Sequence, residues 1–79
     1  MDAREALKAC FVDTFQLDAE TNVETLEYQS IGAWDSVGHM QLIAALETTF
    51  DIMIDTQDVL DMSSFGKAVE IMRKYDVVV

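Results

Sequence analysis

Residues 31–40 read IGAWDSVGHM and are followed by QLIAALE over residues 41–47. An Asp-Ser pair therefore sits between a short polar connection and a helix-forming segment with an apolar face. Asp35 or Ser36 is expected to be the N-cap of a helix over about residues 36–50, because both residue types bind the free N–H groups of a first helical turn. At this boundary Ser36 is expected to be exposed and to lie beside a carboxylate.

Apolar residues at helical spacing predict three further helices. The first is expected over about residues 3–15, a brief third near residues 56–60, and the last from Phe65 with Ser63 or Ser64 as its cap. The inward-facing positions are Ala3, Leu7, Cys10, Phe11, Thr14 and Phe15 in the first helix, Val37, Met40, Ile43, Ala44, Leu46 and Phe50 in the second, Val59 and Leu60 in the third, and Phe65, Ala68, Val69, Met72 and Tyr75 in the last.

The composition agrees with one small helical domain. The chain has 79 residues, no proline and only three glycines, which favours helices over a turn-rich sheet. Residues 16–34 lose the helical spacing, as expected of a long loop with room for one short helical turn. Its expected anchors to the core are Val23, Leu26, Tyr28 and Ile31. The predicted fold is an all-α, small four-helix bundle (three main helices plus a short third) with a long loop between helices one and two, a single domain over residues 1–79.

Cysteine usage and hydropathy favour a cytoplasmic location, and the protein is expected to be a monomer. Cys10 is the sole cysteine, which excludes a disulfide within the chain, and its place on an apolar stripe predicts a buried, inert thiol. The first residues lack the apolar run of a signal peptide. The longest apolar run, residues 42–46, is too short to cross a bilayer.

Charge is strongly negative and unevenly placed. Five basic against fifteen acidic residues give a net charge of −10. All basic residues lie near the two ends of the chain, at Arg4, Lys8, Lys67, Arg73 and Lys74. The acidic middle should repel nucleic acid and anionic membranes and attract partners with basic patches. The alternative is that this charge only keeps the protein in solution.

The triplet Asp35-Ser36-Val37, its position in the chain and the order of the segments after it resemble the acyl carrier protein family, of the discrete type. The resemblance covers nearly the whole chain. It extends through Ala45-Leu46-Glu47 and Phe50-Asp51-Ile52, the short segment near residues 56–60 and the last helix opening at Ser63-Ser64-Phe65.

The resemblance implies a carrier rather than an enzyme. A phosphopantetheinyl transferase, with Mg²⁺ in its complex, would move 4′-phosphopantetheine from coenzyme A onto Ser36. Acyl groups would then travel as thioesters between enzymes of fatty acid, lipid, polyketide or related biosynthesis. Asp35 would belong to the motif that the transferase reads, and it could equally serve as an N-cap. The alternative for Ser36 is that it is only a capping residue.

Acyl-activating and acyl-transferring enzymes with basic patches are the expected partners. Trp34, Val37 and Met40 are the predicted apolar anchors for these enzymes, and Glu47 is the main charge of the second helix. This helix carries few acids for the family, so the docking charge is expected to come mainly from the loop before it and from residues 51–61. Trp34 has an alternative role in packing the loop.

Three other kinds of site receive little support. A catalytic set of Asp35, Ser36 and His39 would need an orienting acid, an oxyanion hole and a cleft that one helix cannot easily supply, so His39 is expected to be a solvated surface residue. The acids of residues 51–61 lack the alternating spacing, glycine and closing glutamate of a calcium loop. The apolar residues of the later helices are expected to form the core, and some of them could line a cavity for an acyl chain.

Two alternatives to an acyl carrier stay open. An aminoacyl or peptidyl carrier protein would share the phosphopantetheine arm and differ in its cargo. A non-covalent acidic helical adaptor would bind a basic groove through the second helix and never carry an arm. Modification of Ser36 separates the adaptor from both kinds of carrier.

Overall fold

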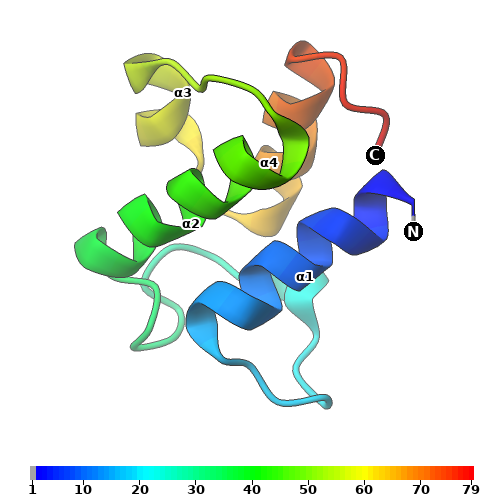
Figure 1. Cartoon of the computed structure of the whole chain (residues 1–79). Helices are drawn as coiled ribbons and strands as arrows, with labels where there is room; N and C mark the ends of the chain where they lie inside the picture. Colours follow the sequence, from blue (N-terminus) through cyan, green and yellow to red (C-terminus); the bar gives the residue numbers. More distant parts are fainter. Residues whose placement is uncertain (1) are drawn as a thin grey trace.

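The computed structural model describes residues 2–79, which form four α-helices and one short 3-10 helix (Figure 1). The elements are α1 (Ala3–Phe15), η1 (Val23–Thr25), α2 (Ser36–Phe50), α3 (Thr56–Asp61) and α4 (Phe65–Lys74). No strand occurs within residues 2–79, and η1 is the short turn inside the long loop. The predicted all-α bundle is therefore confirmed. None of its helices is long and apolar enough to span a membrane.

Each α-helix begins at a polar side chain that accepts a hydrogen bond from the backbone three residues further along. These N-caps are Asp2, Asp35, Asp55 and Ser64. Such a bond satisfies one of the N–H groups that a helix start leaves free. The structure thus resolves both alternatives from the sequence, in favour of Asp35 for α2 and Ser64 for α4.

Aromatic side chains from three parts of the chain form the centre of the core. The Phe11 ring of α1 lies 5.4 Å from the Trp34 ring at the end of the long loop and 5.2 Å from the Phe65 ring of α4. Phe15 stacks on Trp34 at 5.3 Å. Each such pair contributes about 0.5–1.5 kcal/mol beyond its buried area. The loop is therefore attached to the bundle by its last apolar residue.

The predicted inward face of α2 is partly wrong. Leu46 and Ile43 are buried as expected, but Val37 is 66% exposed and Met40 55% exposed. The buried face runs instead through Gly38, Leu42, Ile43 and Leu46. Apolar residues occur almost all round this helix, so their spacing alone is compatible with more than one orientation.

Gly38 determines which orientation occurs. A β-carbon at this position would lie 2.0 Å from the Ala33 carbonyl oxygen and 3.3 Å from Cε1 of Phe15. Only glycine lets the first turn of α2 approach the loop and α1 so closely. Gly38 therefore has a packing role, and this role explains why the position is occupied by glycine.

The short helix α3 is attached to α4 through a buried carboxylate. Asp58 is 4% exposed. Its carboxylate accepts a hydrogen bond from the Tyr75 hydroxyl at 2.6 Å and from the Lys74 ammonium at 3.0 Å. The bond from Tyr75, followed by the one from Lys74, lowers the Asp58 pKa, while the carboxylate raises the pKa of both partners. Leu60 was expected to be inward-facing, but it is 72% exposed because α3 turns this side towards solvent.

Replacing Gly38 should test the close approach of α2. Gly38→Ala is expected to cost about 1–3 kcal/mol of unfolding free energy, because the new methyl group overlaps backbone that cannot move aside. Gly66→Ala is the matched control: the nearest atom to its β-carbon is 3.7 Å away, so the better helix former should be neutral or stabilising by up to about 1 kcal/mol. Urea denaturation followed by circular dichroism gives both values, and equal effects would contradict the packing role.

Acid should weaken the contact between α3 and α4. A carboxyl group whose folded pKa is lowered contributes stability that is complete above its unfolded pKa of about 3.9 and is lost as the pH falls through the folded value. As the pH is lowered beneath about 4, the urea midpoint of the wild type should therefore decrease more steeply than that of Asp58→Asn. Asp61→Asn, an exposed change on the same helix, should keep the wild-type slope. A wild-type slope in Asp58→Asn would contradict this assignment.

Candidate functional site

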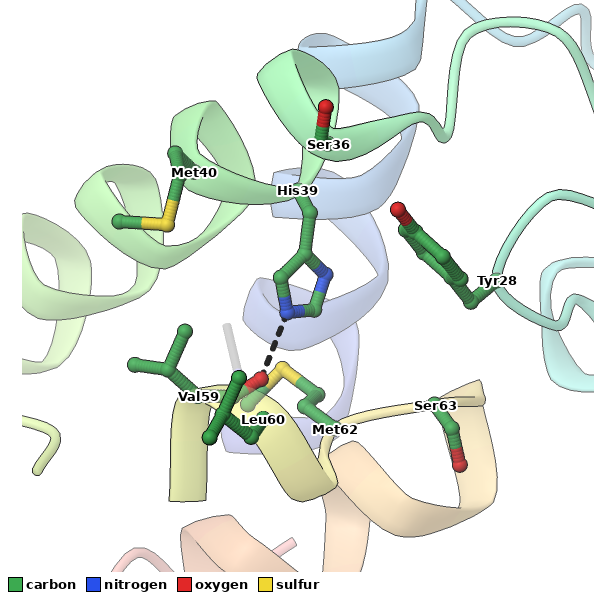
Figure 2. A pocket seen from close by; sticks show the side chains of 8 residues that line it. All are labelled: Tyr28, Ser36, His39, Met40, Val59, Leu60, Met62 and Ser63. Carbon is green, nitrogen blue, oxygen red and sulfur yellow. Dashed lines mark hydrogen bonds between the residues drawn. The ribbon is translucent and has the colours of Figure 1, made fainter. Parts of the chain in front are cut away.

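Ser36 is the first residue of α2 and is exposed. The carboxylate of the preceding Asp35 accepts a hydrogen bond from the Gly38 N–H at 2.8 Å, so Asp35 caps the helix and Ser36 does not. The alternative that Ser36 is only a capping residue is thus wrong. Its hydroxyl points away from the other residues of the pocket beneath it (Figure 2).

The backbone around Ser36 creates a local field suited to an anion. The first N–H groups of α2 point towards its N-terminus, where the helix dipole is positive, and such ends bind phosphate groups. Asp35 uses its carboxylate on one of these N–H groups. A phosphate ester on the Ser36 oxygen would lie at this end of the helix without displacing any core residue.

An apolar pocket of about 330 Å³ lies beneath Ser36, between α2, α3 and the long loop (Figure 2). Its lining residues are Tyr28, Ser36, His39, Met40, Val59, Leu60, Met62 and Ser63. None of these side chains carries a fixed charge. Ser36 thus lies at the edge of a cavity that can shelter an apolar group.

Three of these lining residues, Tyr28, His39 and Ser63, were not expected at a cavity. Tyr28 was expected only as a loop anchor, yet its ring packs edge-on against His39 at 5.6 Å and against Trp34 at 6.3 Å. Leu60 belongs to the apolar residues that were expected in the core or at such a cavity, and it forms part of the pocket wall. Tyr28 lies eight positions before Ser36 in a segment without regular spacing, so no periodic signal could have placed it at the pocket.

His39 is not the solvated residue that the sequence predicted. Its Nδ1 accepts a hydrogen bond from the Trp34 indole N–H at 2.9 Å, and its Nε2 lies 2.7 Å from the Val59 carbonyl oxygen. A carbonyl can only accept, so His39 is a neutral imidazole with its proton on Nε2. Both ring nitrogens are therefore engaged away from Ser36, and neither is placed to take the proton of its hydroxyl.

The structure also corrects the predicted partner role of Trp34. The side chain is 0% exposed, packs among the core aromatics and gives its only N–H to His39. A residue with no accessible surface cannot anchor a partner, so Trp34 has the alternative role of packing the loop. Val37 and Met40 are exposed beside Ser36, where a partner can reach them.

Glu47 has a structural role that the sequence did not reveal. One of its carboxylate oxygens accepts a hydrogen bond from the Ile54 N–H at 2.9 Å. Glu47 thereby holds the connection between α2 and α3, and its side chain is partly buried. A docking role for Glu47 stays a prediction.

Cys10 is buried, as predicted. Its thiol lies 3.3 Å from the Thr49 hydroxyl oxygen. Burial raises the pKa of this thiol, so the thiolate, which is the reactive form, is disfavoured. Cys10 therefore does not belong to the candidate site, which consists of Ser36 and the pocket beneath it.

Comparison of the chain with protein-family models, with curated proteins and with solved structures finds no match. The resemblance to acyl carrier proteins thus rests on the sequence pattern alone. The function has to be argued from the geometry of Ser36, its helix and its pocket.

Proposed function

We propose that this protein is an acyl carrier that holds 4′-phosphopantetheine covalently on Ser36. The observation that carries the proposal is an exposed serine hydroxyl on the first residue of α2, directly after the N-cap Asp35 and at the edge of an apolar pocket. A carrier needs one hydroxyl that a modifying enzyme can reach, and it needs no catalytic base of its own. Ser36 meets the first condition because it is exposed. The second condition also fits, because both ring nitrogens of His39 are engaged elsewhere.

The residues around Ser36 fit the group to be attached. Phosphopantetheine ends in a thiol that carries acyl groups as thioesters when it is bound. The free N–H groups of α2 stabilise the phosphodiester charge. Asp35 keeps the first turn of α2 formed, so that Ser36 is presented in one orientation to a transferase.

The pocket favours an acyl cargo over an aminoacyl cargo. Its lining has no carboxylate to pair with an ammonium group, and both nitrogens of His39 are already bonded. Burying an unpaired charge is costly, whereas burying an alkyl chain gains about 0.8 kcal/mol per CH₂. The aminoacyl or peptidyl carrier is therefore the second candidate. In such a carrier the loaded arm would have to stay outside the pocket.

Partner enzymes are proposed to bind near Ser36. Val37 and Met40 offer apolar surface on α2, and the net charge of −10 attracts basic patches. Fatty acid, lipid or polyketide synthesis would supply such partners, and a cytoplasmic monomer would suit the role. The non-covalent adaptor would use the same surface without modification of Ser36.

Modification of Ser36 tests the proposal directly. Incubation of the folded, unmodified protein with coenzyme A, Mg²⁺ and a broad-specificity phosphopantetheinyl transferase should add one phosphopantetheinyl unit, measured as intact mass. Ser36→Ala should gain nothing, because it lacks the accepting oxygen. A wild-type protein that stays unmodified under conditions that load a known carrier would favour the adaptor.

Asp35→Asn is a matched variant in the same experiment. Asparagine caps a helix about as well as aspartate, so α2 should stay folded while the charge next to Ser36 is removed. Slower loading with unchanged circular dichroism would indicate that a transferase reads the carboxylate. Loading at the wild-type rate would limit Asp35 to capping.

The cargo preference can be measured as protection of the thioester. An octanoyl thioester on the loaded protein should be hydrolysed by water more slowly than an alanyl thioester, because the pocket covers only the apolar chain. Each rate is compared with that of the same thioester on free pantetheine. Normalisation to free pantetheine removes the intrinsic reactivity of each thioester. Equal protection of the two cargoes would remove the reason to prefer an acyl carrier.

A further inference from the structure

The short helix α3 depends on contacts with its neighbours. It has six residues, fewer than an isolated helix needs to be stable in water. Two of its residues, Val59 and Leu60, form one wall of the pocket. The width of the pocket therefore depends on what holds α3 in place.

One of these contacts is with the end of α4 and is ionic, through Asp58. Another comes from α2 and is neutral. The Val59 carbonyl lies in the last turn of α3, where helix carbonyls lose their partners within the helix. The Ser63 N–H, which would be its partner if the helix continued, bonds to the Asp61 carbonyl instead. The His39 Nε2–H occupies the Val59 carbonyl at 2.7 Å, so α2 caps the end of α3.

The orientation of His39 is itself imposed by the core. The Trp34 indole is fully buried, and its N–H donates to Nδ1 of His39 at 2.9 Å. The two rings lie side by side and nearly in one plane, with centroids 6.2 Å apart and planes 14° from parallel. A buried donor without an acceptor would cost about 1–3 kcal/mol, so Trp34 holds Nδ1 as an acceptor and leaves the proton on Nε2 for Val59.

We propose that His39 is the positioning residue that latches α3 to α2 and thereby sets which cargo lengths the pocket holds. The proposal rests on the carrier function as regards cargo, but the latch itself exists without any modification. His39 lies within the pocket lining, between Ser36 above and the Val59 carbonyl below (Figure 2). Loss of its hydrogen bonds frees the wall formed by α3.

Hydrogen exchange on the unmodified protein tests the latch. His39→Phe keeps a flat ring against Trp34 and removes both hydrogen bonds. The amides of Val59 and Met62, which bond to the carbonyls of Asp55 and Asp58, should exchange about tenfold faster than in the wild type, as expected for the loss of the single hydrogen bond that joins α3 to α2. His39→Gln, whose amide has both an acceptor and a donor, should restore part of the protection.

Global stability is measured on the same variants, because a general loss of structure would also speed exchange. Amides of α1 and of the middle of α2 should change no more than the urea midpoint requires. Unchanged exchange in α3 of His39→Phe, or acceleration equal to that of α1, would overturn the latch.

The effect on cargo is read from loaded protein. Hydrolysis of butanoyl, octanoyl and hexadecanoyl thioesters should show a length preference in the wild type. In His39→Phe the ratio of the fastest to the slowest hydrolysis rate among the three cargoes should be smaller by threefold or more. An identical length profile in both proteins would overturn the role in cargo selection. A protein that cannot be loaded at Ser36 would overturn the proposed function, while the exchange result would still decide the latch.

Discussion

The burial of Trp34 is the interaction on which the rest of the structure depends. Its ring joins the end of the long loop to Phe11 and Phe15 of α1, and this contact determines where α2 begins. Its indole N–H cannot reach water, because the side chain is 0% exposed, so it must have an acceptor within the protein. His39 supplies that acceptor, and the choice of tautomer then directs the other ring nitrogen to α3. One buried donor thus links the first turn of α2 to the end of α3 through His39.

The polar contacts that α3 makes with α4 and with α2 differ in their chemistry. The contact with α4 depends on the charge of Asp58, whereas the contact with α2 is a neutral hydrogen bond from His39. Acid removes the first by protonating the carboxylate, since the lowered Asp58 pKa places this loss below its ordinary titration range. The pocket wall is therefore held from two sides that respond to different conditions.

The sequence predicted the helices more accurately than it predicted their faces. Polar caps and apolar spacing are local signals, and they identified all four α-helices, including residues 36–50. The orientation of α2 was missed because its apolar residues surround the helix, so that it depends on how closely Gly38 approaches the Ala33 carbonyl of the loop and the Phe15 ring of α1. No alternation within one helix can reveal a contact of that kind.

The candidate site shows the same division. Ser36 was identified from the residues beside it, and the structure has it exposed at a helix start. Trp34 has the second of its two predicted roles, packing the loop, whereas the prediction of a solvated His39 was wrong. Their mutual hydrogen bond and the Val59 carbonyl, twenty positions away from His39, depend on tertiary structure. Burial of a polar residue follows from its partners, which the local sequence does not contain.

The residues from Trp34 to His39 combine structural and exposed positions, and the geometry of a helix start separates them. Trp34, Gly38 and His39 face the loop, α1 and α3, and they fix the position of α2. Ser36 and Val37 are exposed at the same helix start. The buried contacts therefore hold the backbone of the first turn in one place, so that a group attached to Ser36 would start from a defined point above the pocket. Delivery by a carrier requires this combination of a fixed attachment point and a free surface around it.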